Sequence, residues 1–229
     1  SFVHLHIHSD YSLVDSTIRL PDKPEYGDPA KAPRPNLISR AAVLDMPALA
    51  LTDQSNLCAL VKFYRAAEAN GIKPIAGVDL WIANRADAGM PSRLTVLCQN
   101  RTGYLNLSQL ISRSYIEGRR GDHAIVQPDW FAGHADGLIA LAGRNSDVGR
   151  MLLSDKHDLA LDRTREWLWL FGDRWYFELT RTAHADETHY VEAALQLAGS
   201  ADCPVVATND VRFLTREDFH AHEARVCIH

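Results

Sequence analysis

Residues 1–15 read Ser-Phe-Val-His-Leu-His-Ile-His-Ser-Asp-Tyr-Ser-Leu-Val-Asp, and this stretch is the starting point for predicting the fold. Three histidines alternate with apolar residues: His4, His6 and His8. A strand over residues 2–8 would place the three imidazoles on one face. Neutral imidazole is a good ligand for zinc or manganese, and Asp10 and Asp15 follow as carboxylate ligands. The pattern favours a metal site over its alternative, a solvated strand face, but two or three ligands do not complete a site.

Seven short apolar runs predict strands, because each is rich in the aliphatic and aromatic residues of buried parallel strands. They lie at residues 2–8, 48–52, 74–82, 94–98, 137–142, 175–179 and 204–208. Apolar residues at helical spacing lie between most of them, around residues 57–64, 107–111, 159–170 and 187–197. Repeated strand–helix units predict a parallel α/β fold, either a barrel or a doubly wound sheet.

Residues 16–36 interrupt this rhythm, because they hold Pro21, Pro24, Pro29, Pro33 and Pro35. Proline is excluded from helix and sheet interiors, so we expect an exposed surface loop here. A tolerated surface insertion is favoured over a lid or contact loop.

The composition is that of a soluble globular protein, with 229 residues, 46% hydrophobic and 23% charged. The net charge of −5 gives no general attraction to DNA or acidic membranes. Neither a membrane-spanning run nor a signal peptide is predicted. The four isolated cysteines are typical of a reducing cytoplasm. The start without Met and the end within an apolar pattern suggest a piece cut from a longer chain.

Histidine and aspartate gather where the predicted strands end. His6 and His8 are followed by Asp53, Asp79 and Asp210 at the ends of later strands. In parallel α/β folds these ends meet at one edge, where the chemistry is found. Any single aspartate has another explanation, such as a helix cap for Asp53. Together they indicate a metal-dependent, hydrolase-like centre.

Five longer motifs carry a resemblance to a known family. They are His-Leu-His-Ile-His-Ser-Asp-Tyr-Ser (4–12), Leu-Thr-Asp-Gln-Ser-Asn-Leu-Cys-Ala-Leu-Val-Lys-Phe-Tyr (51–64), Gly-Ile-Lys-Pro-Ile-Ala-Gly-Val-Asp (71–79), Arg-Thr-Gly-Tyr-Leu-Asn-Leu (101–107) and Val-Val-Ala-Thr-Asn-Asp-Val-Arg-Phe (205–213). Across essentially the whole chain they resemble the N-terminal PHP (polymerase and histidinol phosphatase) domain of bacterial DNA polymerase III alpha subunits. The resemblance implies one PHP domain over residues 1–229, folded as a distorted seven-stranded (β/α)7 barrel.

The complete form of this family holds up to three metal ions, and the resemblance implies which residues correspond to its ligands. The matching positions are His6, His8, Asp15, Asp79 and Asp210. Three positions depart from the pattern, namely Gln54, Arg93 and Arg212, and the region around Arg144 lacks the usual cysteine.

Arginine has no lone pair to offer a metal, so these departures oppose ion binding. We therefore expect a degenerate site without catalytic residues, with at most a weakly held zinc, manganese or magnesium ion. Buried carboxylates without metals need a compensating cation. Arg212 is accordingly predicted to lie within salt-bridge distance of Asp15, Asp79 or Asp210.

The resemblance implies a scaffold within a nucleotidyltransferase that docks the proofreading exonuclease (epsilon) subunit and packs against the rest of the alpha chain. DNA would be bound only through the complete subunit. An active metal-dependent phosphoesterase and the PHP domain of an error-prone paralogue are the alternatives. Gln54 and Arg212 speak against the phosphoesterase. The intact segments at residues 8–12 and 56–64 look more like the replicative form than like the error-prone paralogue. Trp167 and Trp169 could belong to an interface, although packing between helix and barrel is the favoured explanation.

Overall fold

The structure is a computed structural model that describes residues 2–21, 35–84 and 90–228. The chain divides into two compact units, which we describe separately. The first unit comprises Ser1–Val78 and Asn209–His229, and the second comprises Asp79–Thr208. That the whole chain is a single domain stays a prediction.

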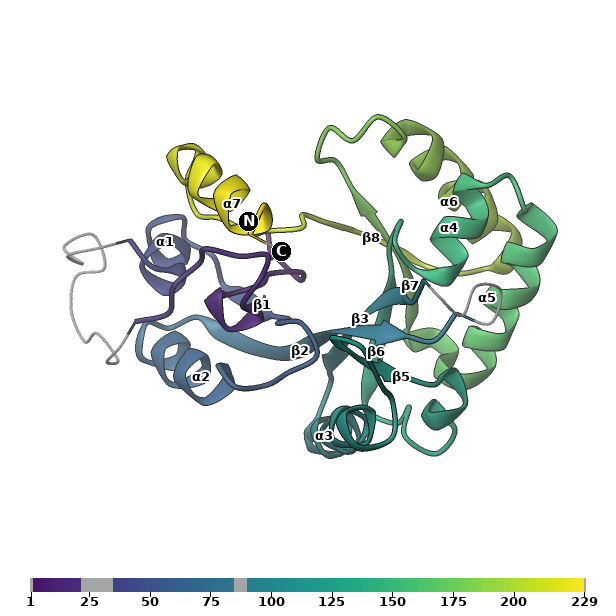
Figure 1. Cartoon of the computed structure of the whole chain (residues 1–229), viewed down its shortest axis with the longest axis horizontal. Coiled ribbons are helices and arrows are strands. Elements are labelled where there is room, and N and C mark those ends of the chain that lie inside the picture. The colour runs from purple at the N-terminus through teal and green to yellow at the C-terminus, as the bar shows by residue number, and fades with distance from the viewer. Residues whose placement is uncertain (1, 22–34, 85–89, 229) are drawn as a thin grey trace. The chain divides into compact units, whose positions relative to one another are not determined.

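The first unit is built from short elements (Figure 1). Buried apolar residues of these elements and of the segments between them form its core. Its elements are η1 (Asp10–Ser12), α1 (Leu37–Val43), β1 (Ala48–Leu51), α2 (Leu60–Ala69), the first part of β2 (Lys73–Ile82), η5 (Arg216–Asp218) and α7 (Phe219–Val226). β1 runs parallel to β2, with Ala48 opposite Lys73 and Leu51 opposite Ala76. Asn36 begins α1 with a capping box, in which its side chain accepts from the N–H groups of Ile38 and Ser39.

The second unit contains most of the sheet and four α-helices. After the end of β2 follow β3 (Ser92–Cys98), α3 (Arg101–Ile116), β4 (Arg119–Arg120), β5 (His123–Val126), η3 (Pro128–Phe131), β6 (Leu138–Ala142), α4 (Asp147–Leu153), α5 (His157–Phe171), η4 (Gly172–Arg174), β7 (Trp175–Thr180), α6 (Glu187–Ala201) and β8 (Val205–Thr208). The strand order is β4-β5-β2-β3-β6-β7-β8. β6, β7 and β8 are parallel to one another, whereas β3 is antiparallel to β6.

The predicted α/β class is confirmed, and six of the seven predicted runs correspond to β1, β2, β3, β6, β7 and β8. The first run is not a regular strand, because only Ile7 forms an isolated parallel bridge, with Val211. The prediction of a parallel sheet was also wrong for part of the sheet, since the pairs β3–β6 and β4–β5 are antiparallel. The pattern of apolar residues in the sequence did not predict β4 and β5, because these strands have only two and four residues.

The beginning of the Pro-rich region belongs to the core of the first unit. Ile18 and Leu20 are buried in a cluster with Ile7, Leu49 and Phe63. The prediction of an exposed surface loop is therefore wrong for its first residues. Their apolar side chains, Ile18 and Leu20, alternate along an extended segment and point into the core. Residues 22–34, which hold most of the prolines, lie outside the described residues.

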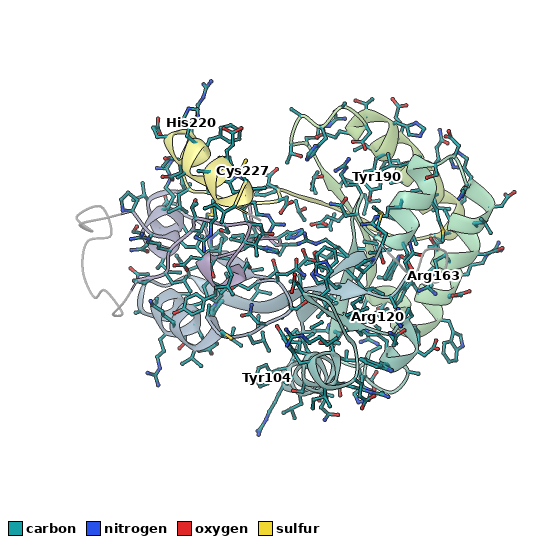
Figure 2. All side chains as sticks on the ribbon, viewed as in Figure 1. Tyr104, Arg120, Arg163, Tyr190, His220 and Cys227 are labelled. Carbon is teal, nitrogen blue, oxygen red and sulfur yellow. The ribbon has the colours of Figure 1, made fainter. Side chains whose placement is uncertain are left out.

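Aromatic side chains dominate the core of the second unit. Trp167 stacks on Trp175 with ring centroids 5.2 Å apart, and Phe171 lies beside both. Tyr190, marked in Figure 2, donates its hydroxyl proton to the carbonyls of Ala142 and Glu178. Trp167 is therefore a packing residue, as favoured, whereas Trp169 is 82% exposed.

None of the helices in the described part of the chain is both long and apolar enough to cross a membrane.

Candidate functional site

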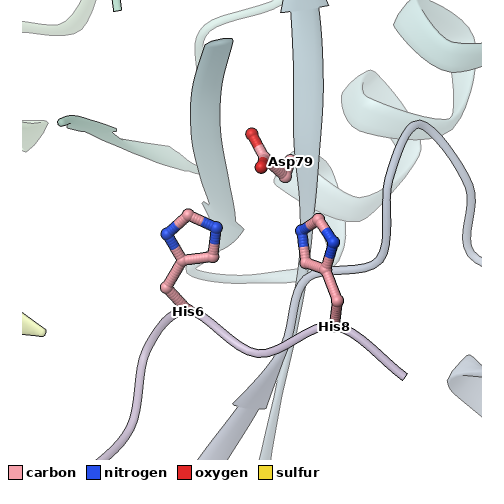
Figure 3. A group of neighbouring side chains, drawn as sticks. All are labelled: His6, His8 and Asp79. Atoms are coloured by element: carbon pink, nitrogen blue, oxygen red, sulfur yellow. The ribbon is translucent and has the colours of Figure 1, made fainter. Parts of the chain in front are cut away.

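His6 and His8 extend from the same side of the first segment of the chain (Figure 3). The N–H of His8 donates to the carbonyl of Val211 at 3.1 Å, and the N–H of Val211 donates to the carbonyl of His6 at 3.1 Å. Ile7 between them faces the core and is 1% exposed. The two imidazole centroids are 5.6 Å apart. The predicted placement on one face is confirmed for these two histidines.

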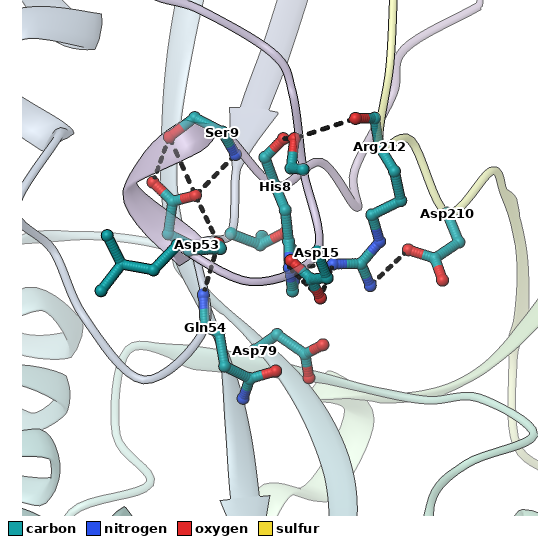
Figure 4. Close-up of polar contacts among 12 residues, drawn as sticks. His8, Ser9, Asp15, Asp53, Gln54, Asp79, Asp210 and Arg212 are labelled. Atoms are coloured by element: carbon teal, nitrogen blue, oxygen red, sulfur yellow. Dashed lines mark hydrogen bonds and ion pairs between the residues drawn. The ribbon is translucent and has the colours of Figure 1, made fainter. Parts of the chain in front are cut away.

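Arg212 lies among the carboxylates of the first unit (Figure 4). Its guanidinium pairs with Asp15 at 2.6 Å and with Asp210 at 2.6 Å. Burial lowers the pKa of Arg212 to about 9, which leaves the group positively charged at neutral pH. The predicted ion pair of Arg212 is therefore confirmed, with two of the three expected partners.

His8 is engaged by the same pair. Its Nδ1 lies 3.0 Å and 3.1 Å from the two carboxylate oxygens of Asp15 and also contacts the guanidinium of Arg212. One ring nitrogen either donates a proton or accepts one, so it serves only one of these partners at a time. His6 is held more loosely, with its Nε2 3.7 Å from Asp210. The arginine therefore sits where the histidines and carboxylates converge.

Asp53 is the centre of a second polar group in the first unit. It is 2% exposed and accepts from the N–H of Ser9 at 2.6 Å and from the hydroxyl of Ser12 at 2.8 Å. The Ser9 hydroxyl also donates to it, at 2.8 Å. Burial raises the pKa of Asp53, and these hydrogen bonds partly oppose the shift. The N–H of Gln54 donates to the hydroxyl of Ser12 at 3.0 Å, which places Gln54 beside this group.

Asp79 and Arg93 belong to the second unit, where they form a buried ion pair. The side chain of Asp79 is 1% exposed, and that of Arg93 is 20% exposed. The Arg93 guanidinium also lies over the ring of Trp81, 5.0 Å from its centroid. Trp81 in turn packs on His123, with centroids 4.4 Å apart. Arg93, which also departs from the metal-ligand pattern, is thus held by its ion pair with Asp79 and by packing of its guanidinium over the ring of Trp81.

Arg144 provides a third arginine–carboxylate pair, also within the second unit. It donates to Asp186 at 2.6 Å, and this contact lowers the pKa of Asp186. Close by in sequence, the buried Glu178 accepts from the hydroxyl of Thr208 at 2.6 Å. All three arginines in or near the predicted ligand positions therefore pair with carboxylates.

The serines and Glu178 escaped prediction from the sequence. Ser9, Ser12 and Glu178 belong to no metal-ligand pattern, so spacing alone did not single them out. The available signal was Asp53 itself, because a buried carboxylate requires donors. The hydroxyl groups that donate to it lie 44 and 41 residues away in the sequence, so spacing did not identify them.

The donor set does not fit a cluster of several metal ions. Arg212 supplies the positive charge beside Asp15 and Asp210, and Arg93 supplies it beside Asp79. A guanidinium has no lone pair and stays protonated, so neither arginine replaces a missing ligand. A cation brought close to either arginine meets repulsion of about 4 kcal/mol per unit charge at 4 Å and an effective dielectric of 20.

The sequence of the chain is similar to a known domain family and to longer bacterial proteins. The model of the PHP domain family matches residues 4–182. DNA polymerase III subunit alpha of Xylella fastidiosa (strain Temecula1) is 53% identical over 229 residues, which are the whole of this chain and 19% of the relative. The corresponding subunits of Pseudomonas aeruginosa and Escherichia coli K12 are 46% and 45% identical, again over the whole chain and 18% of each relative. The chain thus spans about a fifth of the length of these relatives.

Two solved structures share the fold. One is an amidohydrolase from Chromobacterium violaceum, with a TM-score of 0.53, 16% identity and coverage of 98% of this chain and 97% of the other. The second is a protein of Bifidobacterium adolescentis that carries the description metal-dependent phosphoesterase, with a TM-score of 0.53 and 14% identity. It covers 97% of this chain and 96% of its own. These likenesses show the fold alone, and the predicted PHP-type α/β fold is confirmed. The chain belongs to the PHP domain family.

Proposed function

We propose that the chain is the PHP domain of a replicative DNA polymerase III alpha subunit and acts there as a scaffold without phosphoesterase activity of its own. Identity of 45–53% to alpha subunits over the entire chain supports the first part. Arg212 between Asp15 and Asp210 carries the second part, because its fixed charge takes the role that metal ions have in a hydrolytic centre.

The proposed scaffolding role rests on the two segments of the chain that the ion pairs of Arg212 hold together. It joins Asp15, which follows η1, to Asp210, which follows β8 in the sequence. The carbonyl of Arg212 also accepts from the hydroxyl of Ser16 at 3.0 Å. Segments about 200 residues apart in sequence are thereby tied together by charge and hydrogen bonds, with no ion required.

Hydrolysis assays on the full-length polymerase test this proposal. The purified subunit is incubated with p-nitrophenyl phosphate and pyrophosphate in the presence of manganese, zinc or magnesium. We expect no turnover above that of a matched Asp15→Ala, Asp210→Ala variant. Metal-dependent turnover that disappears in that variant would refute the loss of phosphoesterase activity.

An active metal-dependent phosphoesterase is the second candidate. The adjacent imidazoles of His6 and His8 favour it, as does the shared fold of a protein described as a metal-dependent phosphoesterase. Within the first unit, a residual site would draw on His6, His8, Asp15 and Asp210 for a single zinc, manganese or magnesium ion. The same assay separates the two candidates.

The partners follow from the proposed polymerase. We propose that the complete subunit is a cytoplasmic nucleotidyltransferase, that the remainder of the alpha chain packs on this domain, and that the proofreading exonuclease docks on it. The net charge of −5 supports DNA contact through the complete subunit only. Titration of the full-length subunit and of a form lacking residues 1–229 with the exonuclease tests the docking. Equal affinity of both forms would place the exonuclease elsewhere.

A further inference from the structure

A cavity of about 130 Å³ lies in the first unit, and we call it the α1 cavity because residues of α1 line it together with Ile7 and Val211. Ile7 and Leu49 belong to the buried core, whereas Leu44, which also lines the cavity, is 49% exposed. The cavity therefore extends from the core to the surface. A cavity of about 150 Å³ with an apolar lining holds benzene, so the α1 cavity has room for one phenyl or branched aliphatic group.

The lining of the α1 cavity favours an apolar occupant. Met46 and Phe213 line it beside the aliphatic residues already named, and both are partly buried. Protein interiors are close-packed, and side chains that border a cavity lose dispersion contacts on that side. The thioether of methionine is polarizable and adapts to different partners. An apolar group in the cavity would restore these contacts.

One face of α1 brings a positive charge to the α1 cavity. Leu37, Arg40, Ala41 and Leu44 all line it, and their spacing of i, i+3, i+4 and i+7 places them on one side of the helix. The side chain of Arg40 is exposed and forms no ion pair with the residues that the structure describes. None of the described carboxylates lines the cavity. A guanidinium stays protonated and matches the geometry of a carboxylate, so this cavity favours an anionic group beside the apolar one.

His4 adds a hydrogen-bonding group to the same lining. Its Nδ1 is buried and has no hydrogen-bond partner in the described part of the chain. Its ring contacts that of Phe2, with centroids 4.9 Å apart. Buried polar atoms nearly always have a partner, and an imidazole nitrogen can either donate or accept a proton. His4 is therefore a second indication, independent of Arg40, that the cavity takes a polar as well as an apolar group.

We propose that the α1 cavity binds a small apolar carboxylic acid in its ionised form. The phenyl or branched aliphatic group of the acid fills the cavity. Its carboxylate pairs with Arg40 and accepts a hydrogen bond from His4. This ligand site goes beyond the proposed function and does not depend on it.

Ile7 and Val211 connect the α1 cavity to the ion pairs of Arg212. Both residues line the cavity, and they form the isolated parallel bridge of the first unit. Across this bridge the N–H of His8 donates to the carbonyl of Val211, and Arg212 is the next residue in the chain. A bound acid contacts both sides of the bridge and therefore opposes its opening.

NMR of the full-length chain, isotope-labelled at its methionine methyl groups, tests the site. The signal of Met46 is assigned with Met46→Leu. The probes are hydrocinnamate and isocaproate, and hydrocinnamamide is the uncharged control. We expect both acids to shift the signal of Met46 and not those of Met90 and Met151, which belong to the second unit. The amide should bind at least about tenfold more weakly, because it lacks the charge. An unchanged Met46 signal, or equal binding of acid and amide, would overturn the proposal.

Variants of Arg40 test the role of the charge. Arg40→Ala should weaken binding of hydrocinnamate at least about tenfold, and Arg40→Lys, which keeps the charge, should restore part of the affinity. Arg65→Ala is the matched control, since Arg65 is also exposed, lies on α2 and does not line the cavity. Equal affinities of the Arg40→Ala and Arg65→Ala variants would overturn the proposal.

Hydrogen exchange provides a second readout. With hydrocinnamate at about a tenfold excess over its dissociation constant, openings that require an empty cavity become about tenfold rarer. We expect correspondingly slower exchange of the amides of His8 and Val211, and no change in α6 of the second unit. Unchanged exchange of both amides would overturn the proposal.

A short peptide that ends in phenylalanine distinguishes between two sources of the carboxylate. Weaker binding of this peptide than of hydrocinnamate supports a free small acid as the ligand. Equal or tighter binding would show that the α1 cavity takes the C-terminus of a polypeptide, and would overturn the proposal.

Discussion

Arg212 and Asp15 are 197 residues apart in the sequence and form an ion pair at 2.6 Å. Arg212 reaches Asp210 at the same distance, so one guanidinium neutralises two carboxylates. In this arrangement the charge that a metal ion would supply is part of the polypeptide. The ion pair therefore joins two segments that lie far apart in the sequence.

Removing Arg212 should destabilise the chain. Arg212→Ala leaves Asp15 and Asp210 without their cation, but these carboxylate side chains are 27% and 40% exposed. We expect a loss of roughly 2–3 kcal/mol in the free energy of unfolding, below the 3–5 kcal/mol of fully buried pairs. Urea unfolding measures it. The control is Arg165→Ala, from an exposed pair with Asp162, which should cost less than about 1 kcal/mol. Equal effects of the two variants would argue against a structural role for Arg212.

Arg93→Ala should cost more than Arg212→Ala. The Asp79 side chain is 1% exposed, so water cannot compensate for the lost guanidinium. We expect roughly 3–5 kcal/mol in the same urea assay. A smaller loss than in Arg212→Ala would show that burial of the carboxylate does not determine these energies.

The buried Asp53 predicts a specific pH dependence. Its pKa is raised by burial, so the folded state holds the proton more tightly than the unfolded state. Its contribution to stability is therefore full below the unfolded pKa and is lost as the pH rises through the raised folded pKa. The free-energy difference between the natural chain and Asp53→Asn should accordingly be largest in acid and decline toward neutral pH.

Asp186→Asn is the control, for which we expect the opposite dependence of stability on pH. Arg144 lowers the pKa of Asp186, so its contribution is present above the unfolded pKa and is lost as the pH falls. Unfolding curves recorded from pH 3.5 to 7 should show the two differences changing in opposite directions. Parallel trends would contradict the assignment for Asp53.

Gly103 in the motif at residues 101–107 should not tolerate a side chain. A Cβ there would lie 1.8 Å from the carbonyl oxygen of Gly137, a backbone atom that cannot move aside cheaply. Gly103→Ala should destabilise by roughly 1–3 kcal/mol or more, as overpacking does. Gly199→Ala in α6, where nothing lies within 4 Å, should instead stabilise by about 0.5–1 kcal/mol. Thermal unfolding of both variants checks the contrast, and similar melting temperatures would contradict it.

Several features were predictable because they depend on local chemistry. The alternation at His6 and His8 fixed their common face, and the inability of Arg212 to bind metal predicted its carboxylate partners. The antiparallel β3–β6 pairing could not be predicted in this way, because strand direction is set by distant packing. Trp167 and Trp169 are two residues apart, and the sequence could not show that one is buried and the other exposed. The hydroxyl donors to Asp53 likewise come from a segment over 40 residues away.

Metal content tests the central claim most directly. The full-length subunit is purified, treated with a mild chelator, and analysed for zinc, manganese and magnesium by mass spectrometry of the elements. Arginine charges beside Asp15, Asp79 and Asp210 predict less than one tightly bound ion per chain. Two or three ions per chain that survive chelation, and that are lost on substituting Asp15 and Asp210 with alanine, would contradict the account.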